Sequence, residues 1–352
     1  MDKVKKYLPF VGYALFYFVT FAFAAYFTFP YARLRDRVVA EFAADSKGKP
    51  TQQRLEIDEL EPYLLTGVRA RGVRLTTAST PKPLGPEEPP TVISLDEVRA
   101  RVGIFARIFG KTKVSFFVKA FGGEIDGLFV DSATERHVEA ELAGVEVTRI
   151  DPIVSMVGLP MYGAIKGKID LTFPEKRFQK SDGTVSLTIN DLAVGNGVAK
   201  LKGMIALPRT KVGDLVIDLE ARDGVMKVNK LAATGGDLEV GAEGKIGLRD
   251  EPGTSVTDIV LRFKFSEGYK NRNESTKALF AGPLPMFELA PEVKASKRAD
   301  GFYGWHMTGA LANARFEPYA GTGAPPAGAV TPPASPARFG PAIRPGSMGG
   351  GK

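Results

Sequence analysis

The sequence predicts a mostly β protein, in which an N-terminal transmembrane helix is followed by an antiparallel β-sheet domain with few short helices. Three observations predict this fold class. Residues 7–29 form an apolar run without a charged side chain. From Val92 onward, short segments alternate apolar and polar residues, which is typical of strands with one buried and one wet face. Segments with helical patterning are few.

The apolar run 7–29 is long enough to cross a membrane. At about 1.5 Å per residue, a helix of this length reaches about 35 Å, against roughly 30 Å for the hydrocarbon core. Pro9 falls in the first turn, where a missing N–H costs little. Amphipathic rings favour the membrane interface, and tyrosines lie near or beyond the ends of the run: Tyr7, Tyr13, Tyr26 and Tyr31.

A cleaved secretory signal is the alternative interpretation of the same run. Lys3, Lys5 and Lys6 would form its positive n-region, and residues 22–24 (Ala-Phe-Ala) have the small-x-small form of a cleavage site. The apolar run continues past that site to Phe29 and is longer than a usual signal core, which favours the uncleaved anchor. In either case the body that follows is exported.

The chain divides into three predicted parts. Residues 1–32 hold a cytoplasmic N-terminus and the transmembrane helix, residues 33–317 form a β-rich domain, and residues 318–352 form a Pro/Gly/Ala-rich tail that we expect to be disordered. Basic residues flank the span on both sides, so the positive-inside rule is nearly a tie. We place the N-terminus in the cytoplasm because the leading segment is short, and long domains translocate largely regardless of charge.

The first part of the body is less regular than the rest. A helix is predicted over 33–44, where Leu34, Val38 and Phe42 recur at four-residue spacing, and residues 46–50 (Ser-Lys-Gly-Lys-Pro) break it. The second half of 55–75 predicts a short strand pair or a bulged strand. Residues 80–90 form a Pro-rich loop.

Strands then follow one another along the chain. Two helical interruptions are predicted, over 151–157 and 274–280. Half-apolar strands with so few helices leave a long apolar face, which needs cover from a second sheet, the rare helices, a partner or lipid. The strand segments, by their apolar positions, are Val114-Phe116-Val118, Val138-Ala140-Leu142, Ile165-Gly167-Ile169-Leu171, Val185-Leu187-Ile189, Leu215-Ile217-Leu219, Leu238-Val240-Ala242 and Ile259-Leu261-Phe263-Phe265.

A weak repeat of the form Gly-x-apolar runs through the body. If it is structural, each unit is a hairpin that the chain enters through the glycine, which permits a bulge or a sharp twist. The alternative is that these glycines mark ordinary turns. The five glycines are Gly127, Gly167, Gly203, Gly244 and Gly309.

Composition excludes several classes of function. The chain has 352 residues and no cysteine, so it has no disulfide framework and no thiolate chemistry. Of its net charge of +7, residues 1–37 carry +4 and residues 318–352 carry +3, which leaves the body neutral. Nucleic-acid-binding proteins show a basic face, so we expect no nucleic-acid partner.

The apolar run, residues 60–68 (Leu-Glu-Pro-Tyr-Leu-Leu-Thr-Gly-Val) and the Gly-x-Ile-x-Leu strands together resemble the type II secretion system protein N family (GspN). That family is similar to AsmA-like proteins of Gram-negative envelopes. The resemblance covers residues 5 to 315. It implies a single-pass inner-membrane protein with an extended, curved, periplasmic β-sheet domain, accessory to the machine that moves folded proteins across the outer membrane. It brings no catalytic residue and no cofactor.

No motif of the sequence predicts an enzyme, a cofactor site or a metal site. His137 and His306 are far apart, fall on the polar side of their strands and belong to no cluster with ligand spacing. Residues 195–197 (Gly-Asn-Gly) and 122–127 (Gly-Gly-Glu-Ile-Asp-Gly) predict turns, because the first lacks a following helix and the second lacks spaced carboxylates. Residues 273–275 match a glycosylation sequon, a common accident.

Two functions follow. The first is an accessory component of the type II secretion system, which acts by contact with other secretion subunits in the periplasm. The second is an AsmA-like protein that binds or transfers lipid, with phospholipid shielded by the apolar sheet face. Co-purifying secretion subunits would favour the first, and co-purifying phospholipid the second.

Overall fold

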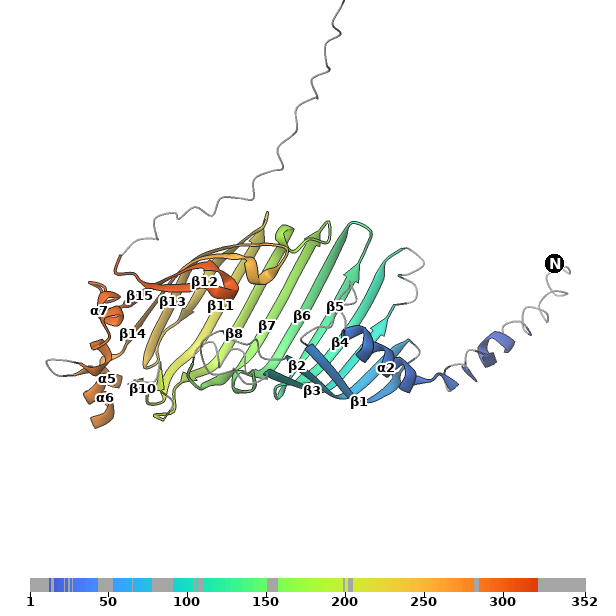
Figure 1. Cartoon of the computed structure of the whole chain (residues 1–352), viewed down its shortest axis with the longest axis horizontal. Coiled ribbons are helices and arrows are strands. Elements are labelled where there is room, and N and C mark those ends of the chain that lie inside the picture. The colour runs from blue at the N-terminus through green and yellow to red at the C-terminus, as the bar shows by residue number, and fades with distance from the viewer. Residues whose placement is uncertain are drawn as a thin grey trace, which may run out of the picture.

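A computed structural model shows one long, curved sheet with short helices near its two ends (Figure 1). It describes residues 13, 16–21, 23–24, 26, 28–43, 53–64, 66–77, 91–103, 106, 110–150, 158–198, 200–201, 205–281 and 285–321. The prediction of a mostly β chain with an antiparallel sheet and few helices is confirmed.

Among the described residues, fourteen strands form this sheet, each antiparallel to its neighbours. In order across the sheet they are β1 (Gln53–Tyr63), β2 (Gly67–Thr77), β3 (Thr91–Val102), β4 (Thr112–Ala120), β5 (Gly123–Asp131), β6 (Glu135–Glu146), β7 (Met161–Pro174), β8 (Asp182–Val194), β11 (Thr210–Arg222), β12 (Val225–Ala233), β13 (Leu238–Gly247), β14 (Val256–Phe265), β15 (Tyr303–Ala310) and β16 (Arg315–Pro318). The strands β9 (Lys200–Leu201) and β10 (Ile205–Ala206) form a separate pair.

The order across the sheet follows the order in the chain, so the sheet is a meander of hairpins. The turn between β4 and β5 is an example: Phe121 and Gly122 both have positive φ, 54° and 76°, the conformation that tight hairpin turns require. Of the segment 122–127, for which a turn was predicted, only Gly122 belongs to this turn, and residues 123–127 lie in strand β5. The sheet is open, with β1 and β16 at its edges.

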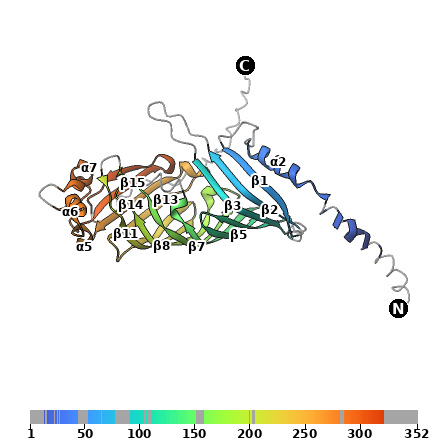
Figure 2. The ribbon, with the colours of Figure 1, turned by 90° about the horizontal axis from the view of Figure 1, so that it is seen from below.

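Short helices lie near the two ends of the sheet (Figures 1 and 2). At one end, α2 (Tyr31–Phe42) lies beside β1, where Arg35 Nη1 donates to the carbonyl oxygen of Asp58 at 3.4 Å. Helix α2 confirms the helix predicted at 33–44, although both of its ends lie two residues earlier in the chain. The other end carries α5 (Glu267–Lys270), α6 (Glu274–Phe280) and α7 (Pro291–Ala295), of which α6 matches its predicted range. The short 3-10 turns are η1 (Val147–Arg149), η2 (Phe178–Lys180), η3 (Pro252–Thr254), η4 (Met286–Glu288) and η5 (Leu311–Asn313).

The segment 55–75 differs from its prediction. Of the two alternatives for its second half, the short strand pair is wrong: that half forms one strand, β2, whose register with β1 shows no shift, and the first half of the segment belongs to β1. The pairing has a clear electrostatic basis, because acidic residues of β1 lie opposite basic residues of β2: Glu59 faces Arg71, and Glu61 faces Arg69. Opposite charges directly across an antiparallel pair are favourable.

Several predicted segments lie outside the described residues. They are the break at 46–50, the Pro-rich loop at 80–90, the helix at 151–157 and the tail from 322 onward. Strand β16 ends at Pro318, the first residue of the predicted tail.

The predicted transmembrane run at 7–29 lies partly outside the described residues. Among those that are described, no helix is long and apolar enough to cross a membrane. The described residues of the run are largely helical, and four of their phenylalanines are strongly exposed: Phe16, Phe18, Phe21 and Phe23 are between 64% and 72% exposed.

Candidate functional site

One side of the sheet, here called the apolar face, carries apolar side chains on strand after strand. In an antiparallel pair, residues directly opposite each other point to the same side. The register therefore places on this face Leu60 (β1), Ala70 (β2), Val98 (β3), Val118 (β4), Ile125 (β5), Leu142 (β6), Ile169 (β7), Leu187 (β8), Ile217 (β11), Val228 (β12), Val240 (β13), Phe263 (β14) and Tyr303 (β15).

Part of the apolar face is closed by the protein itself. A buried cluster occupies one end of the central strands, and it includes Val147 of η1, which packs with Val145, Ile165, Ile189 and Val212. These residues are 0–9% exposed. This cluster gives the sheet a core where η1 lies against β7.

Outside this cluster, much of the apolar face is only half-buried. Phe116, Phe129, Ile169, Leu171 and Leu219 all have intermediate exposure although they lie inside long strands. The fourteen strands belong to a single sheet, and the described helices lie near its ends rather than over its middle (Figure 2). Of the four kinds of cover that the sequence left open, a second sheet large enough to cover this face is not found among the described residues, because the other sheet there is the two-stranded pair β9–β10.

Glycines let neighbouring strands approach closely on this face. Gly167 has φ +142°, and a Cβ there would lie 2.1 Å from the carbonyl oxygen of Ser186 on β8. Gly127 lies opposite Phe116, whose ring occupies the space that a side chain would need. Both glycines lie inside strands, as does Gly244 of β13. The interpretation of the repeat as hairpins entered through a glycine is therefore wrong at these positions; Gly203 lies outside the described residues.

An aromatic cluster fills the end of the apolar face beside α5, α6 and α7. Tyr303 and Phe263 stack with ring centroids 5.6 Å apart, and Phe265 stacks on Tyr269 at the same distance. Phe280 and Phe287 complete the cluster and lie against Phe265 at 4.6 and 5.3 Å. Aromatic pairs at these separations stabilise beyond the area they bury. The helices therefore close this end of the face.

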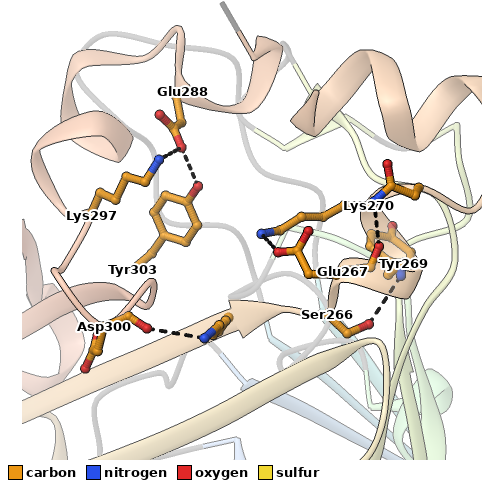
Figure 3. Close-up of polar contacts among 10 residues, drawn as sticks. Ser266, Glu267, Tyr269, Lys270, Glu288, Lys297, Asp300 and Tyr303 are labelled. Carbon is orange, nitrogen blue, oxygen red and sulfur yellow. Dashed lines mark hydrogen bonds and ion pairs between the residues drawn. The ribbon is translucent and has the colours of Figure 1, made fainter. Parts of the chain in front are cut away.

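Buried polar groups fix the helices to the sheet. Thr210 of β11 donates to the hydroxyl of Tyr269 at 2.6 Å, and that hydroxyl donates to the carbonyl oxygen of Pro208 at 3.1 Å. Burial raises the pKa of Tyr269. Ser266 caps α5 by accepting from the backbone N–H of Tyr269 (Figure 3).

Asn273, from the sequon at 273–275, caps α6. Its side chain accepts from the backbone N–H of Thr276 at 2.9 Å, and the Thr276 hydroxyl accepts from the backbone N–H of Asn273 at 3.0 Å. This reciprocal pair is a capping box. It gives Asn273 a structural role.

The opposite side of the sheet, the polar face, carries most of the charged side chains. Phe117 of β4 is an apolar residue at a position whose side chain lies on the polar face. The guanidinium of Arg99 covers its ring and is 4.5 Å from the ring centroid. Arg99 also binds Glu97 and lowers the pKa of that carboxyl. The arrangement shows how Phe117 is accommodated among charges.

The two histidines lie on the polar face, on strands that are not neighbours. His137 of β6 contacts the hydroxyl of Thr172 at 3.1 Å, and His306 of β15 contacts Oδ1 of Asp258 at 2.8 Å. No group of three or more His, Cys, Asp or Glu within the described ranges is placed to hold a metal ion. Residues 195–197 form the predicted turn after β8, in which Gly197 N–H donates to the carbonyl oxygen of Leu207.

Searches against protein-family models, curated proteins and solved structures found no significant match.

Proposed function

We propose that this protein binds lipid and shields acyl chains on the open part of its apolar face. The observation that carries the proposal is the half-buried state of Phe116, Phe129, Ile169 and Leu171, which extend the apolar face beyond the closed core. A contiguous apolar surface of this kind marks a binding site for a protein, a membrane or an apolar ligand.

Two further observations favour lipid as the occupant. The aromatic cluster beside α5–α7 closes one end of the face, while the other end lies toward α2 and the N-terminal run (Figure 2). The described phenylalanines of that run are strongly exposed, as they would be in contact with acyl chains. We therefore propose that residues 7–29 anchor the protein in the inner membrane and that the body lies in the periplasm, where it receives lipid beside its anchor.

Photo-crosslinking tests the proposal on full-length protein expressed in cells that are fed radiolabelled phosphate. A benzophenone amino acid replaces Leu171, which is half-buried on the apolar face, or Asp170, which is exposed on the polar face. We expect labelled phospholipid to be attached at position 171 and not at position 170. Equal labelling at both positions, or none at 171 in a folded protein, would refute lipid binding on this face.

The second candidate function is the one that the resemblance implies, an accessory role in type II secretion. The open sheet favours it, because β16 is an edge strand among the described residues, and a strand of another subunit can add to such an edge. Native mass spectrometry of the gently solubilised protein separates the two: secretion subunits bound without phospholipid would favour this role over lipid binding.

A further inference from the structure

A pocket of about 490 Å³ opens at one rim of the sheet, where strands β5 and β7 end and β6 begins. Its lining has two parts. Three aromatic rings, those of Phe129, Phe173 and Phe178, form one part, and three cations form the other: Arg136, Lys176 and Arg177. Asp250, from the connection between β13 and β14, completes the lining.

The aromatic part of the pocket continues the apolar face. Phe129 lies opposite Val138, and Phe173 lies opposite Arg136. Both phenylalanines lie on the apolar face, close to the rim of the sheet. The ring of Phe178 on η2 stacks on Phe173 with centroids 6.0 Å apart. An apolar ligand on the face would therefore meet aromatic rings, and then cations, as it reached the rim.

The cationic part carries one uncompensated positive charge. Asp131 Oδ1 lies 2.9 Å from Lys176 Nζ and 3.3 Å from Arg136 Nε, so one carboxylate is shared by two cations. Arg177 Nη2 lies 2.8 Å from Asp250 Oδ2. Three cations therefore face two carboxylates; the neighbouring Glu175 and Lys180 pair with each other and add no net charge.

Both carboxylates are ionised at neutral pH. The hydrogen bond from Lys176 lowers the pKa of Asp131, and the hydrogen bond from Arg177 lowers the pKa of Asp250. These side chains remain 30–49% exposed, so the charges are open to a ligand in solution.

The backbone holds the cations in place. Glu175 and Lys176 have φ of 55° and 60°, a conformation that residues other than glycine adopt rarely. The backbone N–H of Gln179 donates to Asp250 Oδ1 at 3.3 Å, which ties this turn to the connection after β13. Lys176 and Arg177 are thus presented by a turn that is tied to this connection.

We propose that this rim pocket binds the phosphate of a phospholipid headgroup while the acyl chains lie on the apolar face. The phosphodiester of such a lipid carries one negative charge, which matches the single uncompensated cation of the pocket. Arginine and lysine are the side chains that bind phosphate oxygens with charge-assisted hydrogen bonds. The inference rests on the proposed lipid binding and adds the recognition of the headgroup.

The test measures lipid binding to full-length protein in a mild detergent. The probes are dioleoylphosphatidylglycerol, dioleoylglycerol (which lacks the phosphate) and inorganic phosphate. We expect the wild-type protein to bind the phospholipid more tightly than dioleoylglycerol. The double variant Arg136→Gln/Lys176→Gln should lose at least about tenfold in affinity for the phospholipid, equivalent to about 1.4 kcal/mol, and should bind dioleoylglycerol as before.

A matched control removes two positive charges elsewhere on the neighbouring strand. Lys166→Gln/Lys168→Gln changes exposed residues of β7 on the polar face and should leave binding of all three probes unchanged. The double variant leaves the carboxylate of Asp131 without its two cationic partners. The triple variant Asp131→Asn/Arg136→Gln/Lys176→Gln removes that negative charge as well, and its affinity for the phospholipid is a second test of the pocket. Thermal melting of each variant confirms that it folds.

The outcomes separate the two proposals. If wild-type protein binds dioleoylglycerol and the phospholipid equally well, headgroup recognition is refuted and lipid binding stands. If inorganic phosphate binds as tightly as the phospholipid, the pocket is a site for free phosphate and headgroup recognition is again refuted. If neither lipid binds, both proposals fail.

Discussion

The phenol of Tyr303 donates a 2.7 Å hydrogen bond to Oε1 of Glu288 and thereby joins strand β15 to η4 at the closed end of the sheet (Figure 3). The same carboxylate oxygen lies 2.7 Å from Nζ of Lys297. Burial, with Glu288 beside it, raises the pKa of Tyr303, and Lys297 lowers the pKa of Glu288. The aromatic cluster is therefore closed by a neutral phenol held against an ionised carboxylate.

We expect Tyr303→Phe to lower the free energy of unfolding by about 1.5–3 kcal/mol, the worth of a hydrogen bond to a charged group. Thermal melting of the wild-type protein and of Tyr303→Phe at neutral pH measures this loss of stability. Tyr162→Phe is the control, because the ring of Tyr162 packs against Arg209 with the guanidinium 4.5 Å from its centroid, a contact that the substitution keeps. Equal destabilisation by both substitutions would contradict the role of the Tyr303 hydroxyl.

The same phenol predicts a loss of stability at alkaline pH. Its folded-state pKa is raised above the ordinary value of 10.0, so the stability it contributes is present below about pH 10 and is lost as the pH rises through the folded-state pKa. Wild-type protein should therefore lose melting temperature more steeply above about pH 10 than Tyr303→Phe does. Parallel melting curves for the two proteins across this range would disprove the linkage.

Neighbouring residues of β7 should respond oppositely to the same substitution. Ile169 is half-buried between Ala140 and Val185, whereas Lys168 is exposed and lies 3.2 Å from Glu141 on the polar face. Ile169→Asp should lower the free energy of unfolding by roughly 2 kcal/mol or more. Lys168→Asp should cost about 1 kcal/mol or less, since it affects an exposed ion pair.

Protease resistance and thermal melting of the full-length protein measure both effects, and equal damage would contradict the strand register. Lipid content adds a second measurement. If Ile169→Asp stays folded but no longer retains phospholipid, then lipid rather than protein covers this position.

Gly167 should not tolerate a side chain. Since a Cβ would lie 2.1 Å from the carbonyl oxygen of Ser186, and φ is +142°, Gly167→Ala should destabilise the protein by about 2 kcal/mol or more. Gly268 of α5 is the matched control, because a Cβ there meets no atom within 4 Å; Gly268→Ala should change stability by about 0.5 kcal/mol at most. Chemical unfolding compares the two, and equal effects would refute the close approach of β7 and β8.

The proposed topology predicts where the end of the β-rich domain lies. A reporter that is active only outside the cytoplasm, fused after Gly321, should be active, because a long body follows a single proposed span. N-terminal sequencing of the purified protein should recover the start of the chain, apart from the initiator methionine. Reporter activity confined to the cytoplasm would invert the orientation, and a mature N-terminus at Ala25 would show a cleaved signal.

Local sequence pattern determined the fold class and the faces of the strands. The alternation Ile165-Lys166-Gly167-Lys168-Ile169 places side chains on opposite sides whatever the neighbours are, because successive residues of a strand point in opposite directions. Helix α6 was predictable for a similar reason, since its signals lie within a few residues. The β1–β2 hairpin was underestimated because its stabilising charge pairs join residues on different strands, and they appear only once the register is known.

Only the tertiary structure decided how the apolar face is covered and what gathers at its rim. The sequence left open a second sheet, helices, a partner or lipid; the structure has one large curved sheet with helices near its two ends, and beside it the described residues form only the two-stranded pair β9–β10, which is too small to cover the face. Arg177 and Asp250 are far apart in the chain, yet they form a 2.8 Å ion pair at the rim. Such contacts depend on how the sheet curves, and curvature is the summed effect of many strand pairs, bulges and glycines, which no local pattern encodes.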